Sequence, residues 1–389
     1  MTTGFPLYRL PQKAVSNVLR CMDSIDSFLF SLCSQRCERS VGRLNSKVFR
    51  FVVAFQGFHI GMFIEFDDTS VVHVAVLPHT WMSQRLDMEA AQDYRVSYYP
   101  PARKGVNFEK PVGGVEEQWM QNLVEEEAES VVLRELNRLD RWPQKQTFDF
   151  SALSFKSWYY HCKKIYHLKC ITTFIFNNIS FAIDMKQIAR VLGGIKIGTL
   201  MPISQPPEAL QQILALRLPY HMIWLDTHSF ANSLSLQKTM IENIACAQIE
   251  GDEPADAFSV TLDDLLVASA EELTLGLPNI SNKGLNQFLK CWMRGSNSRL
   301  KVLRMNYPCD YVFSEPIIMR NISHVKMSWP DLREKLMEHD YDQDPDEEAP
   351  HICNVLGLHG REATFTFGQT EHGPVCQFYV WNRMCSSFH

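Results

Sequence analysis

The sequence lacks the segments that would place it in a membrane or mark it for secretion. No apolar run approaches the roughly eighteen residues that a membrane span requires, and the first nine residues hold no charged stretch followed by an apolar one. The 11 cysteines contain no CxxC pair, which indicates reduced, mostly buried thiols rather than a disulfide framework. We therefore expect an intracellular protein, cytoplasmic and/or nuclear, without a membrane partner.

An excess of positive charge is also missing. Lysine and arginine number 38 against 44 aspartates and glutamates, for a formal charge of −6. Binding to a phosphate backbone rests mainly on basic side chains, so we expect no nucleic-acid partner. The 389 residues, 46% of them hydrophobic, are enough for two or three packed units.

The usual catalytic and metal-binding motifs are absent as well. The sequence has no GxSxG, no HExxH and no complete phosphate loop around Gly193–Lys196. His161, Cys162, His167 and Cys170 lie close in sequence, but their spacing matches no standard zinc finger, which favours core or surface use. We predict a chain that is not an enzyme and that binds no metal and no cofactor.

Helical periodicity marks the first forty-odd residues. Pro11 suits the start of a helix, and the sequence predicts three short helices, the second capped by Asp23 or Ser24 and the third by Ser34. The apolar residues at helical spacing are Val15, Val18, Leu19 and Met22 in the first helix, Phe28, Leu29 and Leu32 in the second, and Cys37, Val41 and Leu44 in the third.

A unit this small buries too little apolar surface to be stable alone. Leu7, Leu10 and much of the first stripe would then stay in water, which a partner surface would explain. The same stripe could instead pack against the rest of the chain, as most amphipathic helices do. The pattern by itself leaves both possibilities open.

From residue 47 the apolar residues alternate or run continuously, which predicts strands. We expect three of them, at Val48–Phe55, Phe58–Phe66 and Val71–Leu77, followed by a loop and an amphipathic helix at Val115–Leu139. The run of glutamates within that helix is typical of a solvated face.

An internal repeat follows between Cys170 and Asn306. Pairs of small or apolar residues two apart recur about every 25 residues, an interval typical of leucine-rich repeats. The pairs are Phe174/Phe176, Gly198/Leu200, Ile223/Leu225, Ala247/Ile249, Leu273/Leu275 and Leu303/Met305. The helical segments between them are Met185–Leu192, Glu208–Leu216, Ser235–Ile244, Leu262–Ala268 and Lys283–Met293. Stacked strand-and-helix units of this kind predict a parallel-stranded solenoid.

After Tyr307 the pattern loosens. Residues 338–349 form an acidic tract that predicts a flexible loop, and Pro345 stands where a calcium loop requires glycine. Strands near Val355–Leu358, Ala363–Phe367 and Val375–Trp381 predict a closing β-hairpin that needs a sheet to join. The predicted regions are therefore 1–46, 47–150, 151–306, 307–350 and 351–389.

The first segment, FPLYRLPQKAVSNVLRCMDSIDSFLFSLCSQRCERSV, resembles the F-box of the nematode-type F-box families. The features that carry the resemblance are a Leu-Pro pair at 10–11, a Met-Asp pair at 22–23 and a Ser-Leu-x-Ser-x-Arg run at 31–36. Ser24 and Ser27 depart from the family pattern, which commonly has proline and leucine at these places.

The stretch from Phe258 to Met305 resembles the type-two F-box-associated domain that accompanies such F-boxes. GLHGREATFTF at 357–367 is similar to that family's closing hairpin. Together, the pattern and the resemblance predict an α+β protein with an N-terminal three-helix F-box, a small β-rich region and a C-terminal α/β leucine-rich-like repeat domain closed by a β-hairpin.

The resemblance also implies a function. Such a chain would be the substrate-recognition subunit of an SCF-type cullin-RING ubiquitin ligase, binding a Skp-family adaptor, through it cullin, and a protein substrate through the C-terminal domain. The alternative is a non-catalytic binding scaffold that uses the F-box fold outside a ligase. The implied adaptor-binding residues are Leu7, Leu10, Pro11, Val15, Val18, Leu19, Met22, Phe28 and Leu32.

Overall fold

The computed structural model describes residues 7–56, 59–66, 71–77, 92–99, 146–153, 155–177, 185–203, 205–242, 244–251, 259–339, 351–370 and 373–381. The chain divides into two compact units, Met1–Tyr220 and His221–His389, and each is described by itself. The helix predicted at Val115–Leu139 and the acidic tract beyond His339 lie outside the described residues.

The first unit begins with the three predicted helices, preceded by a short 3-10 turn. These are η1 (Leu7–Arg9), α1 (Gln12–Arg20), α2 (Ser24–Leu32) and α3 (Gln35–Gly42). The sheet strands β1 (Val48–Gln56), β2 (His59–Phe66), β3 (Val71–Leu77), β4 (Gln92–Tyr99) and β5 (Gln146–Leu153) follow. The unit continues through α6 (Phe155–Tyr166), β6 (Ile171–Asn177), α7 (Met185–Leu192), β7 (Ile197–Ile203) and α8 (Pro207–Ala215).

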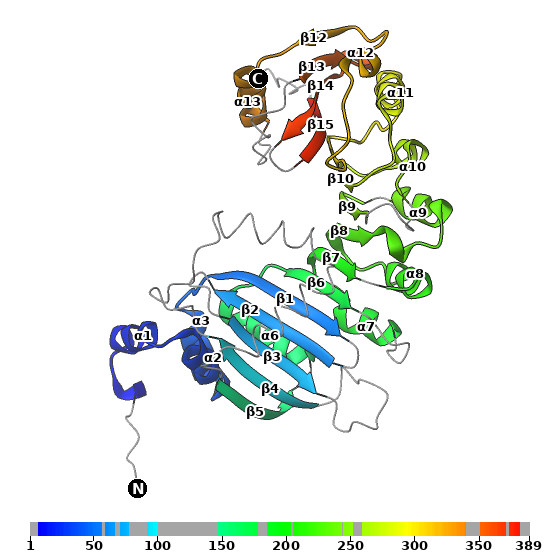
Figure 1. Ribbon diagram of the computed structural model, residues 1–389. Coiled ribbons are helices and arrows are strands. Elements are labelled where there is room, and N and C mark those ends of the chain that lie inside the picture. The colour runs from blue at the N-terminus through cyan, green and yellow to red at the C-terminus, as the bar shows by residue number, and fades with distance from the viewer. Residues whose placement is uncertain are drawn as a thin grey trace. The chain divides into compact units, whose positions relative to one another are not determined.

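The strand order in this unit is β7-β6-β1-β2-β3-β4-β5 (Figure 1). β6 runs parallel to β1 and to β7, whereas β1 to β5 form an antiparallel meander. Helix α6 packs on this sheet through aromatic rings, since Tyr159 lies 6.2 Å from Phe51 and Tyr166 lies 5.3 Å from Phe66, centroid to centroid. Burying large rings on both elements is what holds helix and sheet together.

The second unit begins with four parallel strands that alternate with helices. The elements are β8 (Tyr220–Asp226), η2 (Thr227–Ser229), α9 (Ser233–Met240), β9 (Cys246–Glu250), α10 (Leu262–Val267), β10 (Glu272–Gly276), α11 (Asn282–Met293) and β11 (Val302–Asn306). Their pairing is parallel throughout. Figure 1 shows α9, α10 and α11 along one side of these strands.

The predicted repeat coincides with the alternating strands and helices from β6 to β11. The apolar pairs lie within β6 to β11, and their aliphatic and aromatic members are all buried. Gly198 is the one glycine among the paired residues, and a larger residue would not fit there. A Cβ at this position would lie 2.6 Å from the Thr172 carbonyl oxygen of the neighbouring strand. The alternation of strand and helix is therefore present.

The chain closes with an antiparallel sheet that joins β11. Its elements are α12 (Glu315–Ile318), β12 (His324–Lys326), α13 (Trp329–Glu338), β13 (His351–Leu356), η3 (Leu358–Gly360), β14 (Glu362–Thr370) and β15 (Gly373–Trp381), in the strand order β12-β13-β14-β15-β11. The predicted hairpin is β14 and β15, and the sheet that it needs is supplied by β11, where Val302 pairs with Tyr379.

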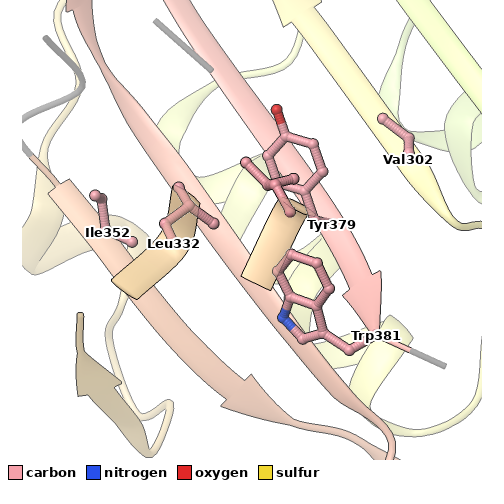
Figure 2. Close-up of a cluster of buried hydrophobic side chains, with 6 residues drawn as sticks. Val302, Leu332, Ile352, Tyr379 and Trp381 are labelled. Carbon is pink, nitrogen blue, oxygen red and sulfur yellow. The ribbon is translucent and has the colours of Figure 1, made fainter. Parts of the chain in front are cut away.

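Residues 307–338 are more regular than the irregular segment that the sequence predicts. Helix α13 starts at a capping box in which Ser328 and Asp331 hold each other's backbone amide groups. Its Leu332 and Leu336 are buried against Ile352, Tyr379, Trp381 and Val302, which Figure 2 shows on strands of the terminal sheet. Two leucines on one face are enough to anchor a ten-residue helix here, although they make a weak sequence signal.

Among the described residues, no helix has the length and apolar character to cross a membrane.

Candidate functional site

The N-terminal helical unit, residues 7–47, is held in shape by local caps. The Asp23 carboxylate accepts a hydrogen bond from the Asp26 amide at 2.7 Å and so begins α2. The Ser34 hydroxyl accepts one from the Cys37 amide at 3.2 Å and begins α3, as predicted. Pro11 is the N-cap of α1 rather than its first helical residue.

Tyr8 ties the turn η1 to the other helices. Its ring stacks on Phe30 of α2 at 6.2 Å, and the Arg36 guanidinium lies 4.1 Å above it. Its hydroxyl donates to Ser40 Oγ of α3 at 3.3 Å. These contacts position Leu7 and Leu10, which flank Tyr8, and sequence reasoning missed this residue because a single aromatic carries no periodic signal.

The predicted adaptor-binding residues separate into two groups. Val15, Leu19 and Phe28 are 7%, 1% and 0% exposed, so the chain itself covers them and they cannot contact a partner in this conformation. Part of the stripe of α1 therefore packs internally, which was one of the two possibilities that the pattern left open, and adaptor binding stays a prediction. The residues that remain accessible define the apolar surface: Leu7, Leu10, Pro11, Val18, Met22 and Leu32.

Basic side chains lie on the same elements as this apolar surface. Residues 7–47 contain seven lysines and arginines but three acidic residues, although the whole chain carries a charge of −6. Arg9, Lys13 and Arg20 lie on η1 and α1 and are exposed. Such a surface favours a partner whose complementary face is acidic.

Helix α6 lies between the N-terminal helical unit and the sheet. Whereas Tyr159 and Tyr166 face the sheet, Trp158 stacks on Phe28 of α2, with ring centroids 5.8 Å apart and planes 22° apart. Trp158 and Phe28 are both fully buried. The helical unit is therefore continuous with the core of the first unit.

Polar contacts complete this junction. The Glu38 carboxylate of α3 lies 3.4 Å from His161 Nδ1 and 2.5 Å from Lys164 Nζ, both on α6. His161 Nε2 lies 2.7 Å from Ser31 Oγ of α2. Helices α3 and α6 approach closely at Gly42. A Cβ at Gly42 would lie 3.3 Å from the Lys164 carbonyl oxygen, which favours glycine at this position.

Burial lowers the pKa of His161, although the neighbouring Glu38 carboxylate acts in the opposite direction. A histidine whose folded-state pKa lies below its ordinary value near 6.5 stabilises the fold above that pH. This stability is lost as the pH falls through the folded-state pKa, since the unfolded chain takes up the proton more readily.

We expect a His161→Gln variant to lose less stability than wild type between pH 7 and pH 5. Glutamine keeps a polar side chain but removes the titrating group. Urea unfolding at several pH values measures the difference, with His221→Gln, at an exposed histidine, as the control that should follow wild type. Parallel slopes for wild type and His161→Gln would contradict this account.

The residues considered as a zinc site do not converge. His161 is engaged with Ser31 and Glu38, and His167 Nε2 lies 2.8 Å from the Gly42 carbonyl oxygen. Cys162 is fully buried, which raises the pKa of its thiol to about 12.

The Gly193-Gly194 pair, which was compared with a phosphate loop, forms the turn between α7 and β7, where Gly194 has a φ of +78°.

The second unit presents a polar strand face on the side away from α9, α10 and α11. Leu225, Ala247 and Leu273 face α9, where they line a small apolar cavity with Met240. The next residues along the strands point the other way, and the register aligns them across β8 to β11. The accessible residues of this strand face are Gln248, Thr274 and Arg304, followed by Asp226, Glu250 and Asn306, whereas Trp224 in the same row is 8% exposed.

On the helix side of these strands, the buried carboxylate of Asp264 in α10 connects α10 to α9. Asp264, which is 0% exposed, accepts hydrogen bonds from Ser233 Oγ at 2.5 Å, Gln237 Nε2 at 2.8 Å and the Thr261 amide at 2.8 Å. Burial alone would raise the pKa of Asp264, but these donors outweigh it and hold the pKa below its ordinary value.

Comparison with known proteins agrees with this geometry. Residues 7–49 match the model of the F-box domain, and residues 235–305 match the model described as F-box associated. The F-box associated domain-containing protein sdz-33 of Caenorhabditis elegans is 30% identical over 76 residues, which cover 18% of this chain and 25% of that protein. The match thus spans about a quarter of the relative's length, and no solved structure matches the chain. The chain contains an F-box domain followed by an F-box associated domain of the kind found in this nematode protein.

Proposed function

We propose that this protein is the substrate-recognition subunit of an SCF-type cullin-RING ubiquitin ligase, acting in the cytoplasm and/or the nucleus. The F-box match at residues 7–49, with the apolar surface accessible on it, carries the proposal. The F-box would bind a Skp-family adaptor and, through it, cullin. The chain itself would be non-catalytic and would raise the effective concentration of a substrate near a ubiquitin-charged enzyme.

The strand face of the second unit is the surface that we propose for the protein substrate. It extends over four parallel strands on the side opposite α9, α10 and α11, and it carries partly exposed amides and charges of both signs. We further propose that the repeating strand-helix units are a degenerate leucine-rich-like solenoid, since such folds use an extended strand face for binding. The burial of the paired apolar residues in β8 to β11 supports this.

The rival function is a binding scaffold that uses the F-box fold outside a ligase. Ser24 and Ser27 favour it to the extent that they depart from the family pattern, although Ser27 is 8% exposed and so lies mostly inside the chain. Adaptor binding separates the two functions directly.

The test is co-purification of the full-length protein with a Skp-family adaptor. A Leu10→Asp/Val18→Asp variant places two charges in the apolar surface without touching the buried Leu19, and Val18 is 38% exposed. We expect the variant to bind at least about 100-fold more weakly, because an unpaired charge in an apolar contact loses its hydration. Raising the salt concentration should also slow association, since basic side chains lie on the same elements as the apolar surface.

Two controls make the result interpretable. Val312→Asp adds a charge at a 77% exposed valine of the second unit and should leave adaptor binding unchanged. Circular dichroism should show the same helix content in all three proteins. If folded wild type fails to bind the adaptor, the ligase function is wrong and the scaffold function takes its place.

A further inference from the structure

Three metal-ligating side chains meet in the second unit, on the terminal sheet. They are Glu315 at the start of α12, His324 at the start of β12 and Cys353 in β13, and their ligand atoms all lie within 4.8 Å of one another. Among the residues that the structure describes, this is the one group of three such side chains that comes together. It lies outside the F-box and outside the strand face, so the proposed function does not use it.

Regular structure places the three residues together. In the antiparallel pair β12–β13, His324 lies opposite Val355 and Lys326 opposite Cys353, so all four side chains project from one face of the sheet. Helix α12 is fixed beside that face by amide side chains of α11. Asn286 Nδ2 donates to the Ile318 carbonyl oxygen at 2.7 Å, and Asn282 Oδ1 accepts from the Ser314 amide at 3.2 Å.

The donor set is one that zinc prefers. A thiolate sulfur, an imidazole nitrogen and a carboxylate oxygen are its three common protein ligands, and three of them leave a fourth tetrahedral position for water. Metal–ligand bonds of about 2.0–2.3 Å put such atoms roughly 3.3–3.8 Å apart, so the three side chains need to close by about 1 Å. Glu315 and His324 are partly exposed, which leaves them room to do so.

Neighbouring groups orient the ligands. His324 Nδ1 lies 2.9 Å from the Ile322 carbonyl oxygen, and an N–H donated there leaves Nε2 as the nitrogen available to a metal ion. His351 Nδ1 lies 3.1 Å from Glu315 Oε2, on the far side of the same carboxylate. Outer contacts of this kind are what hold metal ligands in position in metalloproteins.

Lys326 is the group that a metal would have to displace. Its Nζ lies 2.8 Å from Glu315 Oε1, but its side chain is 70% exposed and can turn into solvent. We propose that Glu315, His324 and Cys353 form a binding site for a zinc-like divalent cation, and that Lys326 neutralises the carboxylate when the metal is absent. The ion would fasten α12 to β12 and β13.

Binding must also release a proton. A cysteine without a metal ion is mostly a protonated thiol at pH 7, whereas the metal ligand is the thiolate. When the Sγ–metal bond forms, the S–H bond breaks and the proton passes to the buffer. Calorimetry of zinc binding in buffers of different ionisation enthalpy should therefore detect the release of about one proton per ion.

Cobalt provides the direct test, because a cobalt–thiolate bond gives a near-ultraviolet charge-transfer band. Full-length protein purified with a chelator and titrated with Co²⁺ should give this band at one ion per chain, and added Zn²⁺ should abolish it. Cys353→Ser should lose the band, whereas Cys309→Ser, at an exposed cysteine of the same unit, should keep it. His324→Gln and Glu315→Gln should weaken zinc binding at least about tenfold.

The Lys326→Met variant distinguishes metal binding at this site from nonspecific binding elsewhere on the protein. If the ammonium competes with the metal, its removal should tighten zinc binding several-fold, as measured against a competing chelating dye. A wild type without the cobalt band, or a band that survives in Cys353→Ser, would overturn the proposal. If Cys353→Ser does not fold, the Glu315→Gln titration decides, and unchanged affinity there counts against the site.

Discussion

Replacing Trp158 with alanine is expected to lower the free energy of unfolding by about 3–5 kcal/mol, the range for removal of a large buried aromatic side chain. Trp158 is fully buried and stacks on Phe28 at 5.8 Å, with His161 edge-on at 6.5 Å. The variant leaves a cavity between α6 and the N-terminal helical unit. Because adjacent residues of α6 pack on the sheet, we expect both parts to lose stability together.

Urea unfolding of the full-length chain measures this effect. Tyr160→Ala, on the same helix but at a side chain that is 47% exposed, is the matched control and should change stability by less than about 1 kcal/mol. Because the chain has two compact units, its unfolding can show two transitions, and the loss should fall on the one that also moves in Phe28→Ala. Equal stabilities of Trp158→Ala and Tyr160→Ala would show that the F-box is not held by α6.

The F-box helices pack on α6, and this packing explains why the F-box surface was only partly predictable from the sequence. Helical spacing correctly grouped Val15, Leu19 and Met22 on one stripe, but periodicity cannot tell which element covers a stripe. The structure buries Val15 and Leu19 and leaves Val18 and Met22 accessible to different degrees. The chain itself therefore covers part of the stripe, and a partner surface stays a prediction for the accessible part.

Other differences between sequence and structure have equally local causes. Strand β4 was missed inside a predicted loop, although Tyr94, Val96 and Tyr98 alternate with polar residues as a strand requires. The repeat was easier to find, because each strand of β8 to β11 contributes a buried pair at the same place in its register. Sequence spacing detects such recurrence, whereas it cannot detect the meeting of Glu315, His324 and Cys353, which depends on the pairing of β12 with β13.

Two residues of the F-box-associated signature acquire a physical role in the structure. Gly295 has a φ of +103°, a conformation that favours glycine, in the turn after α11. Asn297, at φ +48°, donates through Nδ2 to the carbonyl oxygens of Leu265 and Ala268, at 2.9 and 3.1 Å, and so satisfies the end of α10. Asn297 thereby connects α10 to the turn after α11, the next helix along the chain.

Asp264→Ala is expected to cost about 2–4 kcal/mol, because it removes the acceptor for donors from Ser233, Gln237 and Thr261 in a buried setting. These donors belong to α9 and to the start of α10, so the loss weakens the contact between successive units of the strand face. Asp263→Asn, at the exposed neighbour in the same first turn, is the control and should change stability by no more than about 0.5 kcal/mol.

The pH dependence of Asp264→Asn tests the charge itself. Since the folded-state pKa of Asp264 is lower than its ordinary value near 3.8, the ionised carboxylate stabilises the fold fully above that pH, and this stability disappears as the pH falls through the folded-state pKa. The difference in unfolding free energy between wild type and Asp264→Asn should therefore be constant from pH 7 to about 5 and shrink below about 4. A difference that persists unchanged in acid would mean that shape, not charge, makes Asp264 important. In that case the hydrogen bonds from Ser233, Gln237 and Thr261 would be incidental to a well-packed side chain.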